Sequence, residues 1–287
     1  MKGVAEARAF GAATIVNAIA LGRGAAFGID LWTTAKVTIT KSKEIQVIIR
    51  NDPAENTLLA VNTVRHIFKH FGVRAGAEVA VDSNIPIARG LKSSSVAANA
   101  IGLATVKALG KKASGMDVVS MGVDAAIESK VTLTGAFDDA CASFFGGAVV
   151  TDNFTRRLIR RFGINEDPQV LLFIPREKRY TVHTDLEQMR RIAPLVEIAW
   201  ETALHGDYWK ALTLNGYIYS TEMNLDRSVA LTALNAGAIA AGLSGKGPTT
   251  VAVVAPERAG EVKHAWSRYR GEIKEAQINR KRAHVVR

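Results

Sequence analysis

The sequence predicts an α+β protein in two parts, and three observations lead to that class. Segments rich in β-branched residues alternate with segments that carry apolar residues at helical spacing. Two β-branched segments, 31–40 and 44–50, are separated by a short Lys-Ser-Lys stretch and predict a hairpin. Near residue 155 the pattern changes to two strands followed by three helical segments. We therefore divide the chain into 1–155 and 156–287, each long enough for its own core.

Local signals predict the elements of the first part. Apolar residues at three-to-four spacing over 56–71, closed by Gly72, predict a helix. Ser114 and Asp117 form a capping-box pattern that opens a helix running to Lys130. The other expected elements are a strand over 77–82, an Ala-rich helix over 94–109, a helix over 138–145 and a strand over 148–152.

The second part is expected to open with strands and continue with helices. The strands cover 156–162 and 170–175. The remaining expected elements are helices over 185–205, 207–223 and 226–235, strands over 238–243 and 249–255, a helix over 257–269 and a strand-like tail.

The composition indicates the class of protein but does not identify its binding partner. Hydrophobic residues make up 48% and charged residues 22% of the chain, as in ordinary soluble globular proteins. The formal net charge of +10 attracts anions in general. Nucleotides, carboxylate metabolites and nucleic acid are all compatible with it, so the charge does not choose among them.

Cysteine usage and the N-terminus indicate a cytoplasmic protein. Cys141 is the only cysteine, so no disulfide within the chain is possible and no oxidising compartment is implied. The apolar run 9–21 loosely imitates a signal peptide, but Glu6 lies in its would-be basic region and Asn17 interrupts it. No later stretch reaches the roughly 18 unbroken apolar residues of a membrane helix. We expect no membrane association.

A Ser-rich loop between a strand and a helix is the strongest local signal of chemistry. Its sequence is PIARGLKSSSVAA, from Pro86 to Ala98. Backbone N–H groups at the start of a helix are unpaired and bind phosphate, assisted by the helix dipole. A simpler interpretation is a serine N-cap on a buried helix. The loop alone does not decide between them.

Two further segments carry polar residues or glycines. Glu128 and Asp139 lie 139 − 128 = 11 positions apart, and Asp138 precedes Asp139 at the start of a predicted helix. A glutamate at the end of a helix and an aspartate that caps the next helix would give the same sequence pattern without forming a site. The segment 242–250 (GLSGKGPTT) is Gly-rich and is followed by an apolar strand, which also suits an ordinary turn between strands.

The three segments together resemble the GHMP small-molecule kinases, and they occur in that family's order. The loop resembles the second family motif, P-x-x-x-G-L-x-S-S-x-A, with Val96 at the last position. The resemblance implies an α+β, two-lobed GHMP kinase fold, with a ribosomal-protein-like N-terminal domain over 1–155 and a ferredoxin-like C-terminal domain over 156–287. It further implies an enzyme that binds ATP and Mg²⁺.

The resemblance also implies a role for each site residue. Asp139 would be the catalytic carboxylate at the acceptor hydroxyl, with Asp138 as the alternative if the register slips by one. Glu128 and Ser94 would hold Mg²⁺. The ATP phosphates would lie on Pro86, Ala88, Arg89, Gly90, Leu91, Lys92, Ser93, Ser94, Ser95, Gly245 and Gly247.

The acceptor is indicated by a departure from the family. The usual Pro-Gly-Lys/Arg opening of the first motif is missing, and the Ala/Gly-rich segment 11–29 stands in its place. That segment is similar to the archaeal-type shikimate kinases, as are LTGAFDDACASFFGG and AGLSGKGPT. The resemblance implies ATP-dependent phosphorylation of shikimate to shikimate 3-phosphate, in chorismate and aromatic amino-acid biosynthesis. Asn17 and Arg23 are then the candidate acceptor-binding residues.

Other functions remain open from the sequence. The same chemistry on another small alcohol such as homoserine is the nearest alternative. A non-catalytic GHMP-fold ligand sensor is another, although both Glu128 and Asp139 are retained. A basic nucleic-acid-binding protein ranks last, because no basic stripe interleaved with aromatic residues is present. The expected partners are ATP and shikimate, with no nucleic acid, and the oligomeric state is not given.

Overall fold

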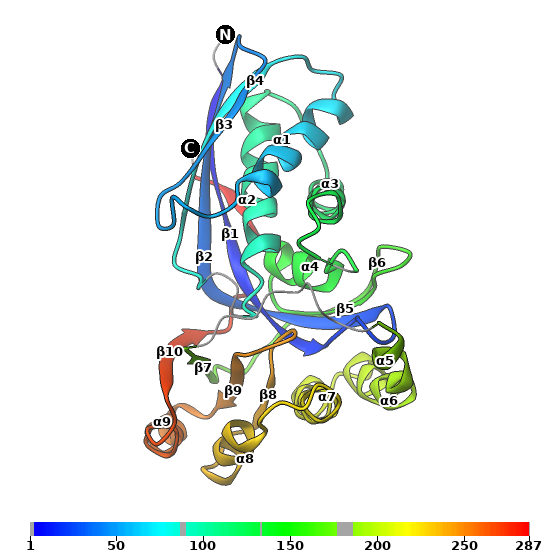
Figure 1. Cartoon of the computed structure of the whole chain (residues 1–287), viewed down its shortest axis with the longest axis vertical. Helices are drawn as coiled ribbons and strands as arrows, with labels where there is room; N and C mark the ends of the chain where they lie inside the picture. Colours follow the sequence, from blue (N-terminus) through cyan, green and yellow to red (C-terminus); the bar gives the residue numbers. More distant parts are fainter. Residues whose placement is uncertain (1–2, 87–89, 133, 177–185, 287) are drawn as a thin grey trace.

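A computed structural model describes residues 3–86, 90–132, 134–176 and 186–286, and it contains two β-sheets with helices packed against them (Figure 1). The larger sheet has seven strands. Five follow the order β11-β1-β2-β4-β3, and β5 pairs with β2 and also with β6. The strands are β1 (Val4–Val16), β2 (Arg23–Thr40), β3 (Ile45–Ile49), β4 (Gly76–Ser83), β5 (Ala148–Asp152), β6 (Arg157–Phe162) and β11 (His284–Val285).

The helices that lie between β3 and β5 in the chain cover one face of the larger sheet (Figure 1). They are α1 (Leu58–His70), α2 (Ser93–Ala108), α3 (Gly115–Glu128) and α4 (Phe137–Phe145). The predicted capping box opens α3, since the Ser114 side chain accepts from the Asp117 N–H and the Asp117 side chain accepts from the Ser114 N–H. The four helices begin and end within two residues of the predicted bounds.

The smaller sheet has the order β10-β7-β9-β8 and is antiparallel throughout. Its strands are β7 (Gln169–Pro175), β8 (Ala240–Leu243), β9 (Thr250–Val254) and β10 (Gly271–Gln277). The accompanying helices are α5 (Leu186–Arg191), α6 (Ala193–Leu204), α7 (Tyr208–Glu222), α8 (Ser228–Asn235) and α9 (Ala259–Trp266), with the 3₁₀ turn η2 (Pro256–Arg258) before α9.

The predicted hairpin over 31–50 is wrong. The strands β2 and β3 both form, but β4 lies between them and pairs with both. The pairing of β3 with β4 is parallel, and parallel neighbours need a crossover, which α1 supplies. A nearby turn signal therefore gave way to a longer-range pairing that buries Val79 and Val81 of β4.

Two other differences have local causes. The predicted helix over 185–205 is interrupted at Ile192, because Pro194 opens α6 and cannot continue a preceding helix. The strand β6 pairs with β5 in the larger sheet, and β11 returns to pair with β1. The two sheets thus part between β6 and β7, and the boundary at 155/156 stays a prediction.

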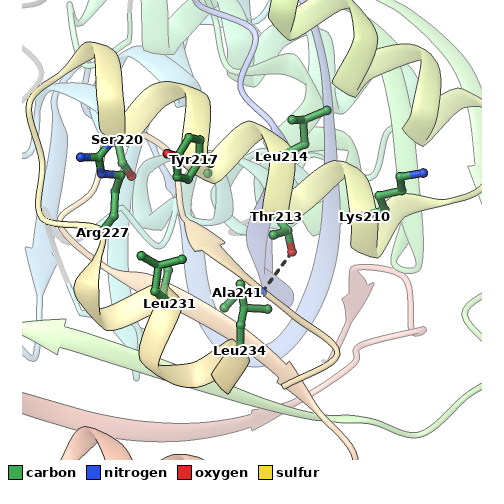
Figure 2. A pocket seen from close by; sticks show the side chains of 11 residues that line it. Lys210, Thr213, Leu214, Tyr217, Ser220, Arg227, Leu231, Leu234 and Ala241 are labelled. Carbon is green, nitrogen blue, oxygen red and sulfur yellow. Dashed lines mark hydrogen bonds between the residues drawn. The ribbon is translucent and has the colours of Figure 1, made fainter. Parts of the chain in front are cut away.

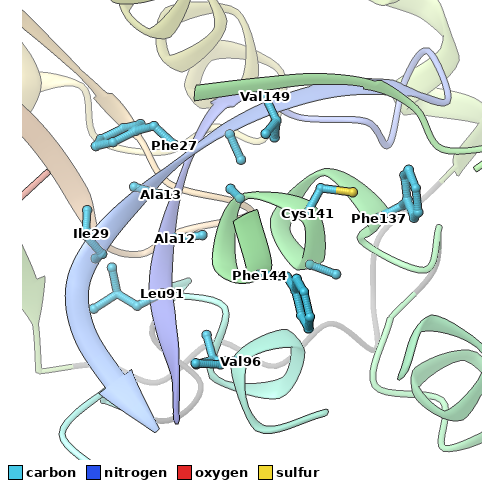
Figure 3. Packing of buried hydrophobic residues seen from close by; sticks show 14 of the residues in the cluster. Ala12, Ala13, Phe27, Ile29, Leu91, Val96, Phe137, Cys141, Phe144 and Val149 are labelled. Atoms are coloured by element: carbon cyan, nitrogen blue, oxygen red, sulfur yellow. The ribbon is translucent and has the colours of Figure 1, made fainter. Parts of the chain in front are cut away.

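The strand β1 and the first part of β2 have no strong strand signal, because small residues fill them. Ala12 and Ala13 of β1 are fully buried and lie in one cluster with Cys141 and Phe144 of α4 (Figure 3). Small side chains let α4 approach the sheet closely, so their burial depends on packing with a distant segment. Cys141 is buried and free. Within the described residues, no helix is long and apolar enough to cross a membrane.

Candidate active site

The N-terminus of α2 lies where the sequence predicts phosphate binding. Lys92 is the N-cap residue, in the left-handed conformation with φ of 63°, and Gly90 before it has φ of 80°. No side chain caps the helix, and its first turn holds no acidic residue. The N–H groups of Ser93, Ser94 and Ser95 open this turn and are suited to an anion. Ala88 and Arg89 lie outside the described residues.

A buried ion pair joins this loop to α4. Lys92 Nζ donates to Asp139 Oδ2 at 2.7 Å, and the two side chains are 14% and 4% exposed. Asp139 Oδ1 is buried and has no hydrogen-bond partner among the described residues. Burial and the neighbouring Asp138 raise the pKa of Asp139 to about 7, and Lys92 opposes that rise. Asp139 therefore has one oxygen held by a cation and the other buried without a described hydrogen-bond partner.

Asp138 faces a different environment from its neighbour. Its Oδ1 accepts from Asn153 Nδ2 at 2.8 Å, next to the end of β5. Its Oδ2 lies against Gly24 of β2, where an added Cβ would be 2.6 Å away. Both aspartates are buried, but only Asp139 contacts the phosphate loop through a described ion pair. Asp138 instead ties α4 to the strands beneath it.

The Gly-rich segment after β8 packs directly on the phosphate loop. Ser244 Oγ donates to the Gly90 carbonyl oxygen at 2.9 Å. A Cβ on Gly90 would lie 2.6 Å from the Ser244 carbonyl oxygen, and a Cβ on Gly245 would lie 3.0 Å from Lys92 Nζ. Gly245 and Gly247 both have positive φ. Glycine is needed here because two backbones approach each other closely.

Lys246 adds a second cation to this region. Burial and the nearby Lys92 ammonium lower the pKa of Lys246 to about 8. The Lys246 ammonium therefore lies close enough to Lys92, at the N-terminus of α2, for the two like charges to repel each other. The sequence motif predicted a turn at this place but did not single out Lys246, since one lysine between glycines is an ordinary surface pattern.

Asn17 lies at the same place but is occupied by protein contacts. Its Nδ2 donates to the Gly245 carbonyl oxygen at 2.9 Å, and its Oδ1 accepts from the Ile19 N–H at 3.0 Å. On α7, Asn215 Oδ1 accepts from the Asn17 N–H, and Tyr219 donates its hydroxyl to the Asn17 carbonyl oxygen. Asn17 is 6% exposed. Its described contacts position the Gly-rich segment, and the acceptor-binding role stays a prediction.

Arg23 also has protein partners. Its guanidinium donates to Glu197 Oε1 at 2.5 Å and stacks over the Trp200 ring, 4.5 Å from the ring centroid. A guanidinium already paired with a carboxylate must give up that pair before it can bind a second carboxylate. The structure therefore offers no support for Arg23 as the cation that binds the acceptor.

Glu128 lies at the exposed end of α3. It pairs with His66 Nε2 of α1 at 2.7 Å, and its side chain is 57% exposed. Within the described residues, no cluster of three or more His, Cys, Asp or Glu side chains is arranged to hold a metal. Mg²⁺ commonly takes one or two protein oxygens and completes its shell with phosphates and water, so Glu128 and Ser94 suit it chemically.

A separate groove lies on the smaller domain, between α7 and α8 (Figure 2). Its volume is about 340 Å³, and its lining is mostly apolar, with Tyr217, Leu231 and Leu234 among the residues. Ala241 of β8 also lines it, and the Ala241 N–H donates to Thr213 Oγ1 (Figure 2). None of the residues predicted for the site lines this groove.

Comparison with known proteins places this geometry in a family. The chain matches the family models of the GHMP kinases N terminal domain over residues 58–147 and the GHMP kinases C terminal over residues 187–272. Shikimate kinase of Methanosarcina acetivorans is 45% identical over 281 residues, which covers 97% of this chain and 95% of the relative. The chain belongs to the GHMP kinase family. It is thus a member of a family of small-molecule kinases, for which ATP is the phosphate donor.

Other relatives and solved structures agree with this membership. Shikimate kinase of Pyrococcus furiosus is 46% identical over 253 residues, covering 88% of this kinase and 92% of the relative. Lactococcus lactis galactokinase complexed with galactose has a TM-score of 0.79 at 15% identity, with 98% of this chain and 95% of that chain covered. Methanococcus jannaschii mevalonate kinase has a TM-score of 0.77 at 15% identity, with 97% and 99% covered. At these identities the two structures show the fold alone, and that fold is the one predicted.

Sequence reasoning missed the contacts that hold the kinase site together. Asn215 and Tyr219 were not predicted as site residues, because they lie 198 and 202 positions along the chain from Asn17. Asn153 lies only 15 positions from Asp138, but no motif marked it. The pairing of Lys92 with Asp139 was also missed. A lysine inside a loop of small residues was the available signal for it.

Proposed function

We propose that this kinase phosphorylates shikimate to shikimate 3-phosphate with ATP as the donor. The kinase chemistry rests on one observation above the others: buried Asp139 lies beside the open N-terminus of α2 with Oδ1 unpaired. The acceptor rests on relatives named shikimate kinase that match nearly the whole chain at 40–46% identity.

Different groups of the chain bind the phosphates and accept the proton during phosphoryl transfer. The N–H groups at the start of α2 bind the terminal phosphates of ATP. Asp139 Oδ1 accepts the hydrogen bond of the acceptor hydroxyl and takes its proton as the new bond to phosphorus forms. A carboxylate with a pKa raised to about 7 is suited to exchange that proton near neutral pH. Phosphoryl transfer depends mainly on positioning and charge neutralisation, so a strong base is not required.

Mg²⁺ would be held by Glu128 and Ser94. When bound, it would supply positive charge that offsets the negative charge of the phosphates. Glu128 is exposed and pairs with His66, so it would exchange that partner for the ion. Asp138 accepts a hydrogen bond from Asn153. This bond holds α4 in place and so keeps the neighbouring Asp139 in position.

The test is a coupled ADP-release assay with ATP, Mg²⁺ and four acceptors: shikimate, homoserine, mevalonate and galactose. We expect turnover with shikimate and none above the acceptor-free rate with the others. Product identity is checked by phosphorus NMR of the reaction mixture. Turnover with homoserine or another alcohol instead would retain the kinase site and discard shikimate. ATP binding without turnover on any acceptor would favour a ligand sensor.

A cytoplasmic location and the absence of nucleic-acid and membrane partners remain predictions that accompany this function. A filter-binding assay with random duplex DNA and RNA at two salt concentrations tests the nucleic-acid prediction. We expect only weak binding that disappears at physiological salt, as for any protein with a net charge of +10.

A further inference from the structure

Lys92 lies where three segments of the site meet. It is the N-cap residue of α2, so its side chain leaves the backbone at the proposed phosphate site. Its ammonium contacts Asp139 on α4 at 2.7 Å. It also lies beside Gly245, where an added Cβ would be only 3.0 Å from Nζ. No other described lysine has its ammonium paired with Asp139.

We propose that Lys92 is a catalytic residue that bridges Asp139 and the phosphoryl group being transferred. This inference rests on the proposed function only in that a phosphoryl group moves to a hydroxyl. It does not depend on which alcohol carries that hydroxyl. It also differs from a simple phosphate-binding role, because the same ammonium serves the base and the phosphate.

In this proposal the two reacting partners bind at opposite ends of the Lys92 side chain. A phosphate on the N–H groups of Ser93 to Ser95 lies next to the residue from which the Lys92 side chain departs. An acceptor hydroxyl bound to Asp139 Oδ1 lies across the same carboxylate whose Oδ2 contacts Nζ. The Lys92 side chain therefore connects the start of α2, where the phosphate would bind, with the carboxylate that would hold the acceptor hydroxyl.

The transfer step balances with these groups. The acceptor oxygen forms a bond to the γ-phosphorus, and the bond between that phosphorus and the β–γ bridging oxygen breaks. ADP leaves with the electron pair of that bond, and the hydroxyl proton passes to Asp139. Lys92 keeps its own protons and stabilises the negative charge on the equatorial oxygens of the moving group.

A purely structural role explains the pair poorly. Burying two charges costs desolvation free energy, and well-packed apolar residues often stabilise a fold as well or better. Lys92 also adopts a left-handed backbone conformation that non-glycine residues rarely occupy. Gly245 has positive φ and leaves space at the Lys92 ammonium. Strain, burial and an adjacent glycine at a single cation are typical of a functional site.

Lys92 also connects the two substrate sites. While the phosphate site is empty, the positive charge of the Lys92 ammonium acts mainly on Asp139. A bound γ-phosphate shares the ammonium and leaves Asp139 with more of its negative charge uncompensated, which strengthens its hydrogen bond to the acceptor. Binding of a non-hydrolysable ATP analogue should therefore tighten shikimate binding, and the coupling is reciprocal.

The test compares Lys92→Met with Lys107→Met, a matched control on the exposed far end of the same helix. Lys92→Met should lower kcat by about 10²–10³-fold, the effect of losing one preorganised charge contact to a transition state. The KM for ATP should change by less than tenfold. Lys107→Met should retain wild-type rates. The acceptor-free release of ADP, in which water replaces the alcohol, should fall in parallel and gives a readout for any acceptor.

Two further measurements separate catalysis from folding. The double variant Lys92→Met with Asp139→Asn removes both charges, so no unpaired buried charge remains. If the two residues act as a unit, its kcat equals that of the worse single variant instead of the product of both losses. The acid limb of the kcat profile should also move to higher pH in Lys92→Met, because the cation that opposes protonation of Asp139 is gone.

The outcomes are distinct. A raised KM for ATP with kcat retained would reduce Lys92 to a phosphate-binding side chain and overturn the proposal. Independent, multiplicative losses in the double variant would also overturn it. No wild-type turnover on shikimate, with the acceptor-free rate still lost in Lys92→Met, would refute the proposed acceptor and leave the role of Lys92 supported.

Discussion

The pairs Lys92–Asp139 and His66–Glu128 both lie beside the larger sheet, and they have the same length but very different burial. Asp139 with Lys92 and Glu128 with His66 are each 2.7 Å apart. The side chains of the first pair are 4% and 14% exposed, and Glu128 and His66 are 57% and 24% exposed. Burial raises the pKa of Asp139 to about 7. Water screens the attraction between Glu128 and His66, so either side chain can exchange its partner at a low cost in free energy.

The difference indicates which carboxylate is held in place and which is free to change partner. A buried pair is costly to break, so Asp139 is held firmly in position. An exposed pair is worth little, so Glu128 can leave His66 for another ligand at small cost. Equal distances in a structure therefore do not imply equal energies. The following predictions test this contrast, from the largest expected effect to the smallest.

Replacing the buried carboxylate should have the largest effect. Asp139→Asn should lower kcat by about 10²–10⁴-fold, the usual contribution of a general base, while ATP affinity stays nearly unchanged. Steady-state kinetics and calorimetric titration of ATP measure the two quantities. Asp138→Asn is the matched control on the adjacent residue and should lose less than about tenfold. A larger loss in Asp138→Asn would exchange the roles of the two aspartates.

The buried carboxylate should also make stability depend on pH. Its pKa is about 7 in the fold against an ordinary value of 3.8, so folding favours the protonated form. That contribution to stability is fully present below pH 3.8 and is lost as the pH rises through about 7. Urea unfolding at pH 5 and pH 8 should show a larger drop for the wild type than for Asp139→Asn. Equal drops in both proteins would argue against a raised pKa at Asp139.

The exposed carboxylate should affect the metal and not the chemical step. Glu128→Gln should raise the Mg²⁺ concentration for half-maximal rate by about tenfold, equivalent to about 1.4 kcal/mol of binding free energy. The kcat at saturating Mg²⁺ should stay within a few-fold of the wild type. An unchanged Mg²⁺ titration would remove Glu128 from the metal site.

The smallest effect is expected from the partner of Glu128. His66→Gln should change the free energy of unfolding by less than about 1 kcal/mol, because exposed pairs contribute little. The Mg²⁺ requirement should stay the same or fall slightly, since Glu128 loses a competitor. Chemical denaturation and the same Mg²⁺ titration measure both. A destabilisation of several kcal/mol would mean that the second pair is held as firmly as the first.

Much of the fold was predictable because its elements depend on neighbouring residues. The capping box of Ser114 and Asp117 fixes the start of α3, and Gly72 follows the end of α1. The hairpin over 31–50 failed because β4, whose position depends on α1, competes for the same strand edges. The strand β1 carries no strong signal, since its alanines are informative only when packed against α4.

The site divides in the same way. The sequence by itself determined the order of the three motifs, the positive-φ glycines that let them approach each other, and the residue types able to bind phosphate. Only the tertiary structure decided that Lys92 pairs with Asp139, that Asn153 holds Asp138, and that His66 holds Glu128. The physical reason is that burial and charge pairing are properties of residues brought together from distant parts of the chain. A motif fixes which chemical groups are present, and packing fixes which of them are buried and which are paired.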